Sequence, residues 1–404
     1  YFTINCKGRN KIMIKKFKLP SGIQDHLPVD CYSRRIVEGK LIDCFKYYGF
    51  NEIETPVLER YELFDSGVGR VELNKLFKVT DVDGDLLILR PDITMPISRI
   101  VCTKLSEGSH KLCYLGKSFS ALENEGKLRE FTQAGVEIMG AQGESVDIEI
   151  VMLAIKSLIA VGLEDFQIEI GHVGFFKGLL DAFKVCEEDR DVLINSIESK
   201  NGIKLYNLSR EPDKLLPDTL SRLPMLFGGV EVLDDAEKMC RNAEMKKAVA
   251  DLKAVYEGVK RLGYEKYICF DMSSVGKMKY YSGMVIRGIN KNLGRPILSG
   301  GRYDSLCDAF GKHIPAVGFA IGVGYLVRAL DNQNKLRKMP EVDVIVGYDP
   351  EFMNIAENKV NDLRKSGINA ICSFATDKKR LKESKIAVGA KSAIFVGKDG
   401  EKEI

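Results

Sequence analysis

Five short blocks of polar, aromatic and glycine residues, spread along the 404-residue chain, constrain its fold and function more than any other feature of the sequence. In chain order they are Leu89–Thr94, Phe131–Glu137, Tyr280–Gly283, Ser299–Asp304 and Pro315–Gly322. The last two are rich in glycine, which taken singly is common at strand ends and in tight packing. Because these two blocks follow one another closely, we interpret them as a strand, turn and helix that form the floor of a ligand pocket.

The segment before the first block predicts a helix followed by a strand. Residues 31–48 carry apolar or aromatic side chains at close to helical spacing, and Gly49 is typical of a helix end. Residues 50–59 then predict a strand that contains Pro56. Proline has no N–H to donate to a neighbouring strand, so we expect this strand to end at a sheet edge or at a crossing of the chain.

The middle of the chain predicts antiparallel strands interleaved with helices. Strand-like runs within 75–90 surround the turn at 83–85, which favours a hairpin. A second strand pair is predicted at 111–119 and 129–138, and an amphipathic helix at 144–162. This order favours an α+β fold, with an antiparallel sheet and helices, over a doubly wound parallel sheet.

The pattern of elements also predicts the domains. We expect 13–335 to form the main domain, with a largely helical insertion at about 175–263, and 342–404 to form a small α/β module. Residues 1–12 contain neither a methionine nor an apolar signal core, and they precede Met13. We therefore interpret them as an upstream or non-native leader.

The composition is that of an ordinary globular protein, with 45% apolar and 29% charged residues. The net charge of +3 is small for this length and no basic block stands out, so no nucleic-acid partner is predicted. No apolar run reaches the roughly 18 residues that span a bilayer, so no membrane contact is predicted. The ten cysteines and four histidines lie scattered, without C-x-x-C or H-E-x-x-H spacing, which predicts reduced thiols in a cytoplasmic protein with no metal and no cofactor.

Together the five blocks resemble the catalytic domain of histidyl-tRNA synthetase. The helix at 31–48 and the proline-containing strand resemble the first signature of class II aminoacyl-tRNA synthetases, which forms a dimer interface in that class. The chain from 342 onward resembles a truncated anticodon-binding domain, because the family's closing helix has no counterpart before Ile404. The resemblance therefore implies a class II synthetase-like antiparallel sheet with helices, followed by the small α/β module.

The resemblance also implies a histidine pocket. In the family, the acidic residue of the L-R-P block and the glutamine of the second block contact the α-amine, while the glutamate and paired tyrosines approach the imidazole. Taken alone, Gln133 and Glu137 could form an exposed pair, but their register with the other blocks favours ligand contact. We therefore predict that L-histidine binds Asp92, Ile93, Thr94, Gln133, Glu137, Tyr280 and Tyr281.

Three arginines that carry the charge work of adenylate formation in the synthetase are missing from the matching positions, which hold Ser120, Gly276 and Tyr325. Such arginines stabilise the negative charge that develops on the α-phosphate, and losing one oxyanion donor typically costs about 10²–10³ in rate. Lys277 and Lys279 lie close by in the sequence, but lysine lacks the bidentate fork used in phosphate recognition. We therefore expect histidine binding without histidine activation.

This combination resembles the regulatory subunits of ATP phosphoribosyltransferase, a family related to the synthetases, and the aspartate in L-R-P-D-x-T fits that family. The resemblance covers about residues 13–400. It implies a non-catalytic, cytoplasmic protein of the first step of L-histidine biosynthesis, which assembles with a short catalytic subunit and supports its activity. It also implies that L-histidine inhibits the complex through this chain, which is expected to form a homodimer within a hetero-oligomer.

Two other classes of protein remain open on the sequence. A true histidyl-tRNA synthetase would exchange pyrophosphate in the presence of ATP and histidine. A synthetase-like module that senses uncharged tRNA would show a basic face and salt-sensitive RNA binding. The missing arginines weigh against the first class, and the small net charge weighs against the second.

Overall fold

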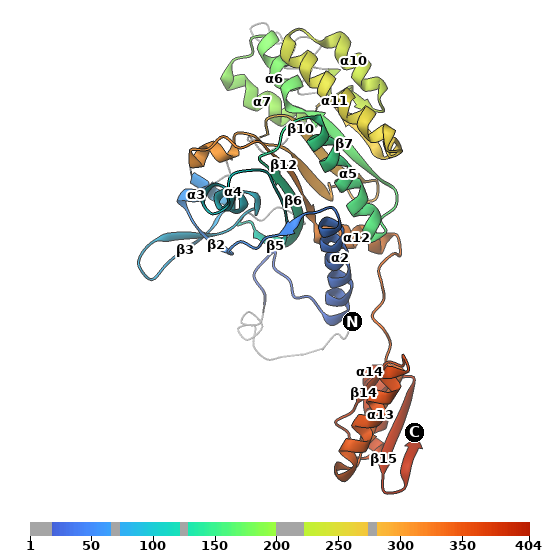
Figure 1. Cartoon of the computed structure of the whole chain (residues 1–404). Helices are drawn as coiled ribbons and strands as arrows, with labels where there is room; N and C mark the ends of the chain where they lie inside the picture. The colour runs from blue at the N-terminus through green and yellow to red at the C-terminus, as the bar shows by residue number, and fades with distance from the viewer. Residues whose placement is uncertain (1–17, 66–72, 122–127, 199–221, 274–280) are drawn as a thin grey trace, which may run out of the picture. The chain divides into compact units, whose positions relative to one another are not determined.

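The computed structural model describes residues 18–65, 73–121, 128–198, 222–273 and 281–404 (Figure 1). The chain divides into two compact units, Tyr1–Leu336 and Arg337–Ile404, and each has a sheet and an apolar core of its own. All five sequence blocks belong to the larger unit. The leader expected at residues 1–12 lies outside the described residues.

One nine-stranded sheet organises the larger unit. Its strands are β1 (Asn51–Glu52), β5 (His110–Phe119), β6 (Glu130–Met139), β7 (Phe166–His172), β8 (Phe227–Gly228), β9 (Ile268–Asp271), β10 (Met284–Asn290), β11 (Leu298–Arg302) and β12 (Ala316–Gly322). Their spatial order is β1-β5-β6-β12-β11-β10-β7-β9-β8. Neighbours are antiparallel except for β1 with β5 and β7 with β9. The predicted α+β architecture is confirmed, with these two parallel pairs as exceptions.

Helices pack on both faces of this sheet. The side that carries the larger core has α2 (Pro28–Tyr47), α5 (Glu144–Val161), α6 (Val173–Ala182), α7 (Glu187–Glu198), α10 (Glu231–Met239), α11 (Ala243–Arg261) and α12 (Val323–Asn332). Among these, α6, α7, α10 and α11 gather at one end of the unit (Figure 1). Part of the expected helical insertion, 199–221, lies outside the described residues. Within the described segments, no helix combines the length and apolar character needed to cross a membrane.

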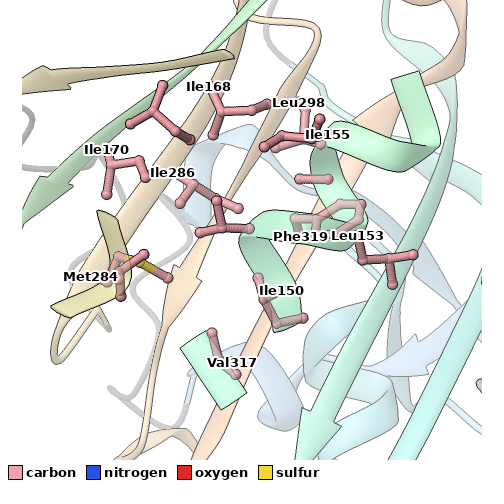
Figure 2. Close-up of a cluster of buried hydrophobic side chains, with 14 of the residues drawn as sticks. Ile150, Leu153, Ile155, Ile168, Ile170, Met284, Ile286, Leu298, Val317 and Phe319 are labelled. Atoms are coloured by element: carbon pink, nitrogen blue, oxygen red, sulfur yellow. The ribbon is translucent and has the colours of Figure 1, made fainter. Parts of the chain in front are cut away.

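Helix α5 is buried more completely than its sequence pattern predicted. Residues 150–155 are all buried, whereas an amphipathic surface helix would expose the side opposite its apolar stripe. The expectation of an amphipathic helix is wrong here because α5 lies between the sheet and the helices α2 and α11, which cover its outer side. Figure 2 shows the resulting core, in which α5 side chains meet those of β7, β10, β11 and β12: Ile150, Leu153, Ile155, Ile168, Ile170, Met284, Ile286, Leu298, Val317 and Phe319.

The N-terminal elements confirm the predicted helix and the crossing at Pro56, but the single strand predicted over residues 50–59 is interrupted, because 53–56 belong to no strand. Helix α2 is followed by Gly49, which has a φ of 81°, a conformation that glycine adopts without strain. Pro56 lies where the chain leaves the edge strand β1 and enters a separate sheet of order β2-β4-β3. That sheet consists of β2 (Leu58–Arg60), β3 (Phe77–Thr80) and β4 (Leu86–Leu89), and the predicted β3–β4 hairpin turns at Gly84, whose φ is 88°.

The second face of the large sheet carries a smaller core. Helices α3 (Glu62–Asp65) and α4 (Thr94–Thr103) and the 3₁₀ segment η4 (Leu306–Phe310) pack here with residues of β5, including Tyr114. The sequence blocks Leu89–Thr94 and Ser299–Asp304 both lead into this region. It is therefore the face on which the predicted ligand residues converge.

The smaller unit is an α/β module with the sheet order β14-β13-β15-β16. Parallel strands β13 (Val344–Tyr348), β14 (Ala370–Cys372) and β15 (Ser392–Gly397) alternate with helices α13 (Met353–Lys365) and α14 (Lys378–Val388). Strand β16 (Gly400–Glu403) pairs antiparallel with β15 and was not predicted from the sequence. The unit has apolar residues on both faces of its sheet, in two clusters.

Candidate functional site

Strand β6 places two of the predicted ligand residues on one face of the sheet. Side chains two residues apart in a strand point to the same side, so Gln133, Gly135 and Glu137 share the face of the smaller core. The intervening Val136 lies in the larger core on the opposite face. At about 3.3 Å per residue, the Cα atoms of Gln133 and Glu137 are roughly 13 Å apart, with a glycine between them.

Glycines on this face make room for the polar groups of the site itself. Gly135 pairs with Tyr114 of β5, and a Cβ at position 135 would overlap the Tyr114 hydroxyl. Gly318 of β12 pairs with Glu137, and a Cβ there would overlap the carboxylate. The two glycine-rich blocks, interpreted as a strand, turn and helix, contain two paired strands, β11 and β12, and Glu137 lies directly against β12.

Glu137 is the most deeply buried of the predicted ligand residues that the structure describes, with 1% of its surface exposed. The Thr94 hydroxyl donates a hydrogen bond of 2.7 Å to Glu137 Oε1. The Tyr303 hydroxyl donates a second one to Oε2. One hydroxyl on each oxygen fixes the orientation of the carboxylate, because hydrogen bonds to a charged or buried acceptor are strongly directional.

The start of helix α4 supplies the acidic residue of the first block. Asp92 Oδ1 accepts a hydrogen bond of 2.8 Å from the Met95 backbone N–H, an amide that has no partner within the helix. Asp92 and Thr94 are both partly exposed as residues. Ile93, by contrast, is 2% exposed and its side chain packs in the smaller core.

Burial shifts the pKa of both carboxyl groups upward. It raises the pKa of Glu137 to about 8, although the hydrogen bonds from Tyr303 and Thr94 oppose the shift and the charge of Asp92 adds to it. Burial likewise raises the pKa of Asp92 to about 6, against the lowering effects of the Met95 amide and the Arg90 charge. Among the described residues, neither carboxylate forms an ion pair with a lysine, arginine or histidine.

Gln133 is oriented by a buried serine. Its Oε1 accepts a hydrogen bond of 2.8 Å from the Ser118 hydroxyl, and Ser118 is fully buried in β5. This contact fixes which end of the amide faces the protein, so the Nε2 end points away from Ser118. Gln133 itself is partly exposed, as expected for a residue at the entrance of a site.

Arg90 of the first block holds the surrounding chain in place. Its guanidinium, 4% exposed, donates to the carbonyls of Thr55, Pro56 and Lys117 and to the Thr55 hydroxyl. A Cβ on Gly116 would lie 2.5 Å from this guanidinium, so the glycine provides the space for it. Arg90 therefore joins the proline-containing crossing to strand β5 beside the site.

The tyrosine pair is described only in part. Tyr281 is 8% exposed, and burial together with the Glu137 charge raises its pKa. Tyr281 packs in the smaller core, on the Glu137 side of the sheet. Tyr280 lies outside the described residues.

The structure describes two of the three positions at which the synthetase has an arginine and this chain does not. Ser120 follows β5, and its amide donates to the Arg129 carbonyl at 2.8 Å. Tyr325 is in the first turn of α12, where its ring packs close to Gly322 and its hydroxyl lies 3.5 Å from Arg295. Gly276, Lys277 and Lys279 lie outside the described residues.

Sequence reasoning missed three residues that shape this site. They are Tyr303, whose hydroxyl holds Glu137 together with that of Thr94, Ser118, which holds Gln133, and Tyr114, whose hydroxyl lies close to Gly135. Tyr303 belongs to the block Ser299–Asp304, which the sequence had singled out only for its glycines. Membership of that block was the one sequence signal that could have marked Tyr303 as a site residue. The partner of its hydroxyl could not be predicted from the sequence.

A separate surface pocket does not contain the predicted ligand residues. A pocket of about 530 Å³ lies between α2 and α5 and is lined mainly by tyrosine and lysine side chains, among them Tyr48, Lys156 and Tyr264. None of the predicted ligand residues lines it. In the part of the chain that the structure describes, no cluster of three histidine, cysteine, aspartate or glutamate side chains could hold a metal ion.

Known proteins are similar to this chain in overall sequence and in fold. A family model described as histidyl-tRNA synthetase matches residues 22–326. The ATP phosphoribosyltransferase regulatory subunit of Acetivibrio thermocellus is 37% identical over 360 residues, which cover 87% of this chain and 86% of the relative. The chain belongs to the family of ATP phosphoribosyltransferase regulatory subunits. The protein of that name from Alkaliphilus metalliredigens is 36% identical over 375 residues, with 91% and 94% covered.

Solved structures confirm the class II synthetase-like fold of the family. A Bacillus halodurans C structure, described as an ATP phosphoribosyltransferase regulatory subunit/histidyl-tRNA synthetase, has a TM-score of 0.82 at 29% identity and covers 94% of this chain and 98% of its own. Histidyl-tRNA synthetase from Nostoc sp. PCC 7120 has a TM-score of 0.77 at 22% identity, with 96% of each chain covered. The second likeness shows a shared fold, and the family resemblance inferred from the sequence blocks is confirmed by the first and by the curated relatives.

Proposed function

We propose that this chain is the non-catalytic regulatory subunit of an ATP phosphoribosyltransferase, and that it binds L-histidine at Asp92, Thr94, Gln133 and Glu137. It supports the activity of a short catalytic subunit and transmits feedback inhibition by histidine to it. The complex acts in the cytoplasm at the first step of histidine biosynthesis. The family name supports the partner enzyme, and the site geometry supports the ligand.

The buried carboxylate of Glu137 carries the proposal for the ligand. It lies at the base of a sheet face whose outer residues, Asp92 and Gln133, are partly exposed. An amino acid with hydrogen-bond donors at both ends suits this arrangement: its ammonium group meets Asp92 near the surface, and its imidazole meets Glu137 below. Small-molecule sites typically have this form, with a few fixed polar groups in an otherwise apolar setting.

The neutral residues around the site support a binding role over adenylate formation. The resemblance to the synthetase puts charge-stabilising arginines at positions that hold Ser120 and Tyr325 here, and neither side chain carries a cation. Charge that develops on an α-phosphate would therefore lack two of its usual partners, which is a loss of several orders of magnitude in rate. Histidine that binds such a site is released unchanged.

Histidine regulates a partner only if it binds one state of the complex more tightly than another. The site is well placed for this, because Glu137 is connected through Thr94 to helix α4 and through Tyr303 to the segment that leads into η4. Ligand binding that changes either hydrogen bond alters the packing of these two elements. We propose that this change reaches the surface that contacts the catalytic subunit.

Calorimetric titration of the full chain with L-histidine, combined with an ATP–pyrophosphate exchange assay, tests the proposed function. We expect saturable binding of histidine and no exchange above background. An active histidyl-tRNA synthetase serves as the positive control for the exchange assay. Exchange by this chain would assign it to the synthetases, and absence of histidine binding would refute the proposed sensor.

The proposal includes a homodimer within the hetero-oligomer. Helix α2 and the crossing at Pro56 match the class II signature that forms a dimer interface in the related synthetases. Symmetric pairing is the common solution for such surfaces. Light scattering of the chain alone should give about twice its mass of 45.1 kDa, and a monomer at micromolar concentration would contradict this part of the proposal.

A further inference from the structure

The charge balance around Glu137 has a consequence for the ligand. The titratable and polar groups that face its carboxyl group are Asp92 and Thr94 at the start of α4, Tyr114 on β5, Tyr281 before β10 and Tyr303 after β11. Strand β12 contributes Gly318, which has no side chain. Within the described residues this set contains one further acid and three phenols, and no cation at ion-pair distance.

In such surroundings the buried carboxyl group of Glu137 stays protonated until a cation binds beside it. Removing an ionised carboxylate from water costs several kcal/mol unless an opposite charge compensates, and the nearby Asp92 makes a second negative charge less favourable still. The raised pKa of Glu137, about 8, agrees with this geometry. At neutral pH the empty site therefore holds Glu137 mainly as the carboxylic acid.

We infer that L-histidine is held with its side chain as an imidazolium cation paired with the Glu137 carboxylate, and that Glu137 itself supplies the proton. This inference rests on the proposed histidine site. On binding, the O–H bond of the Glu137 carboxyl breaks and an N–H bond forms on the imidazole ring, so the proton moves within the complex and none enters or leaves. The carboxylate then keeps the hydrogen bonds from Thr94 and Tyr303 and gains one from the ligand.

The alternative is a neutral imidazole that donates one N–H to an ionised Glu137. That complex holds one proton fewer, and it leaves the buried carboxylate without a compensating cation. The two arrangements differ in the number of protons exchanged with the buffer. At pH 7 a group with a pKa of about 8 is mainly protonated, so the neutral arrangement releases about 0.9 proton per histidine, whereas the imidazolium arrangement releases almost none.

The pH dependence of affinity differs in sign between the two. In the imidazolium arrangement the affinity is nearly flat from about pH 7 to pH 8 and then falls by up to about tenfold per pH unit, because the empty site has lost the proton that the complex needs. In the neutral arrangement the affinity instead rises from pH 7 to about pH 8, and it levels off once Glu137 is ionised. Asp92 is already mainly ionised at pH 7 and contributes little to either slope.

Isothermal titration calorimetry of the full chain with L-histidine, in buffers of different ionisation enthalpy near pH 7, measures the proton count directly. We expect a count close to zero, and release of about one proton would overturn the inference. The wild-type measurement needs no variant. No heat of binding at any pH would instead refute the proposed histidine site, so the two failures are distinguishable.

The variant Tyr303→Phe tests the predicted loss of histidine affinity above about pH 8. The hydroxyl of Tyr303 lowers the pKa of Glu137, so its removal raises that pKa and moves the onset of the affinity loss to higher pH. The α-ammonium of histidine also titrates in alkaline solution, but it does so equally with both proteins. An unchanged onset in a folded Tyr303→Phe protein that still binds histidine would show that Glu137 does not hold the proton.

Discussion

Gly318 lies directly opposite Glu137 in the β6–β12 pair, and a methyl group at position 318 would overlap the Glu137 carboxylate. It would also press on the Val136 carbonyl of the same strand. Glu137 can lie this deep only because Gly318, its neighbour on β12, has no side chain. The position of the Glu137 carboxyl group therefore depends on both β6, which carries it, and β12, which leaves space for it.

Gly318→Ala should weaken histidine binding by about tenfold or more, since the carboxylate must leave the position in which Thr94 and Tyr303 hold it. Overpacking of this kind also typically costs about 1–3 kcal/mol of stability. Calorimetry and thermal unfolding measure the two effects. Gly324→Ala, in α12, is the control, because a Cβ at 324 meets nothing within 4 Å. Wild-type affinity in Gly318→Ala would contradict the close packing of Glu137.

Glu137→Gln should change the pH dependence of stability. Burial raises the pKa of Glu137 from its usual 4.5 to about 8. Between these values the folded protein holds a proton that the unfolded chain has released, so the free energy of unfolding falls as pH rises through this window. Glutamine has no proton to lose, so the variant should gain stability relative to wild type from pH 5 to pH 8, by up to a few kcal/mol. Urea unfolding at several pH values measures the difference; a constant difference would show that Glu137 is ionised in the folded protein.

Arg90→Lys should destabilise the larger unit by about 2–4 kcal/mol, although it conserves charge. One guanidinium donates to four acceptors on Thr55, Pro56 and Lys117, and an ammonium group cannot reproduce this fork. The control is Arg60→Lys, since Arg60 is 69% exposed and its ion pair with Asp85 is of a kind worth little. Urea unfolding compares them, and equal stabilities of the two variants would remove Arg90 from this structural role.

Elements with local signals were predictable from the sequence. The strand pair predicted at 111–119 and 129–138 agrees with β5 and β6 to within about one residue, because apolar period and flanking turn lie in the same stretch of chain. Strand β16 was missed because Gly400–Glu403 is polar and wholly exposed, and only its backbone pairing with β15 makes it a strand. The burial of residues 150–155 on all sides of α5 was missed because its outer cover, α11, comes from a segment far along the chain.

The candidate site shows the same division. Gln133 and Glu137 could be selected from one block, and their common face follows from strand geometry. The bond from Tyr303 to Glu137 joins residues 166 positions apart, and it depends on the register of β11, β12 and β6 together. The burial of Ile93, which precedes the first turn of α4, likewise depends on the core that packs around it and could not be predicted from its block.

Glu137→Ala should weaken histidine feedback on the assembled enzyme. A hydrogen bond to a charged group is typically worth roughly 1.5–3 kcal/mol, so its loss should raise the histidine concentration needed for half inhibition by about 10-fold to 150-fold. The measurement is the initial rate of the assembled phosphoribosyltransferase across a histidine titration, with each rate normalised to that of the same complex without histidine. Glu149→Ala is the control, because Glu149 is a surface acid paired with Lys111 and belongs to no part of the site. Half inhibition at the wild-type concentration in a complex that remains assembled would mean that histidine is sensed elsewhere. A shift of the predicted size in Glu137→Ala, with none in Glu149→Ala, would instead connect the buried carboxylate of this chain to the activity of its partner.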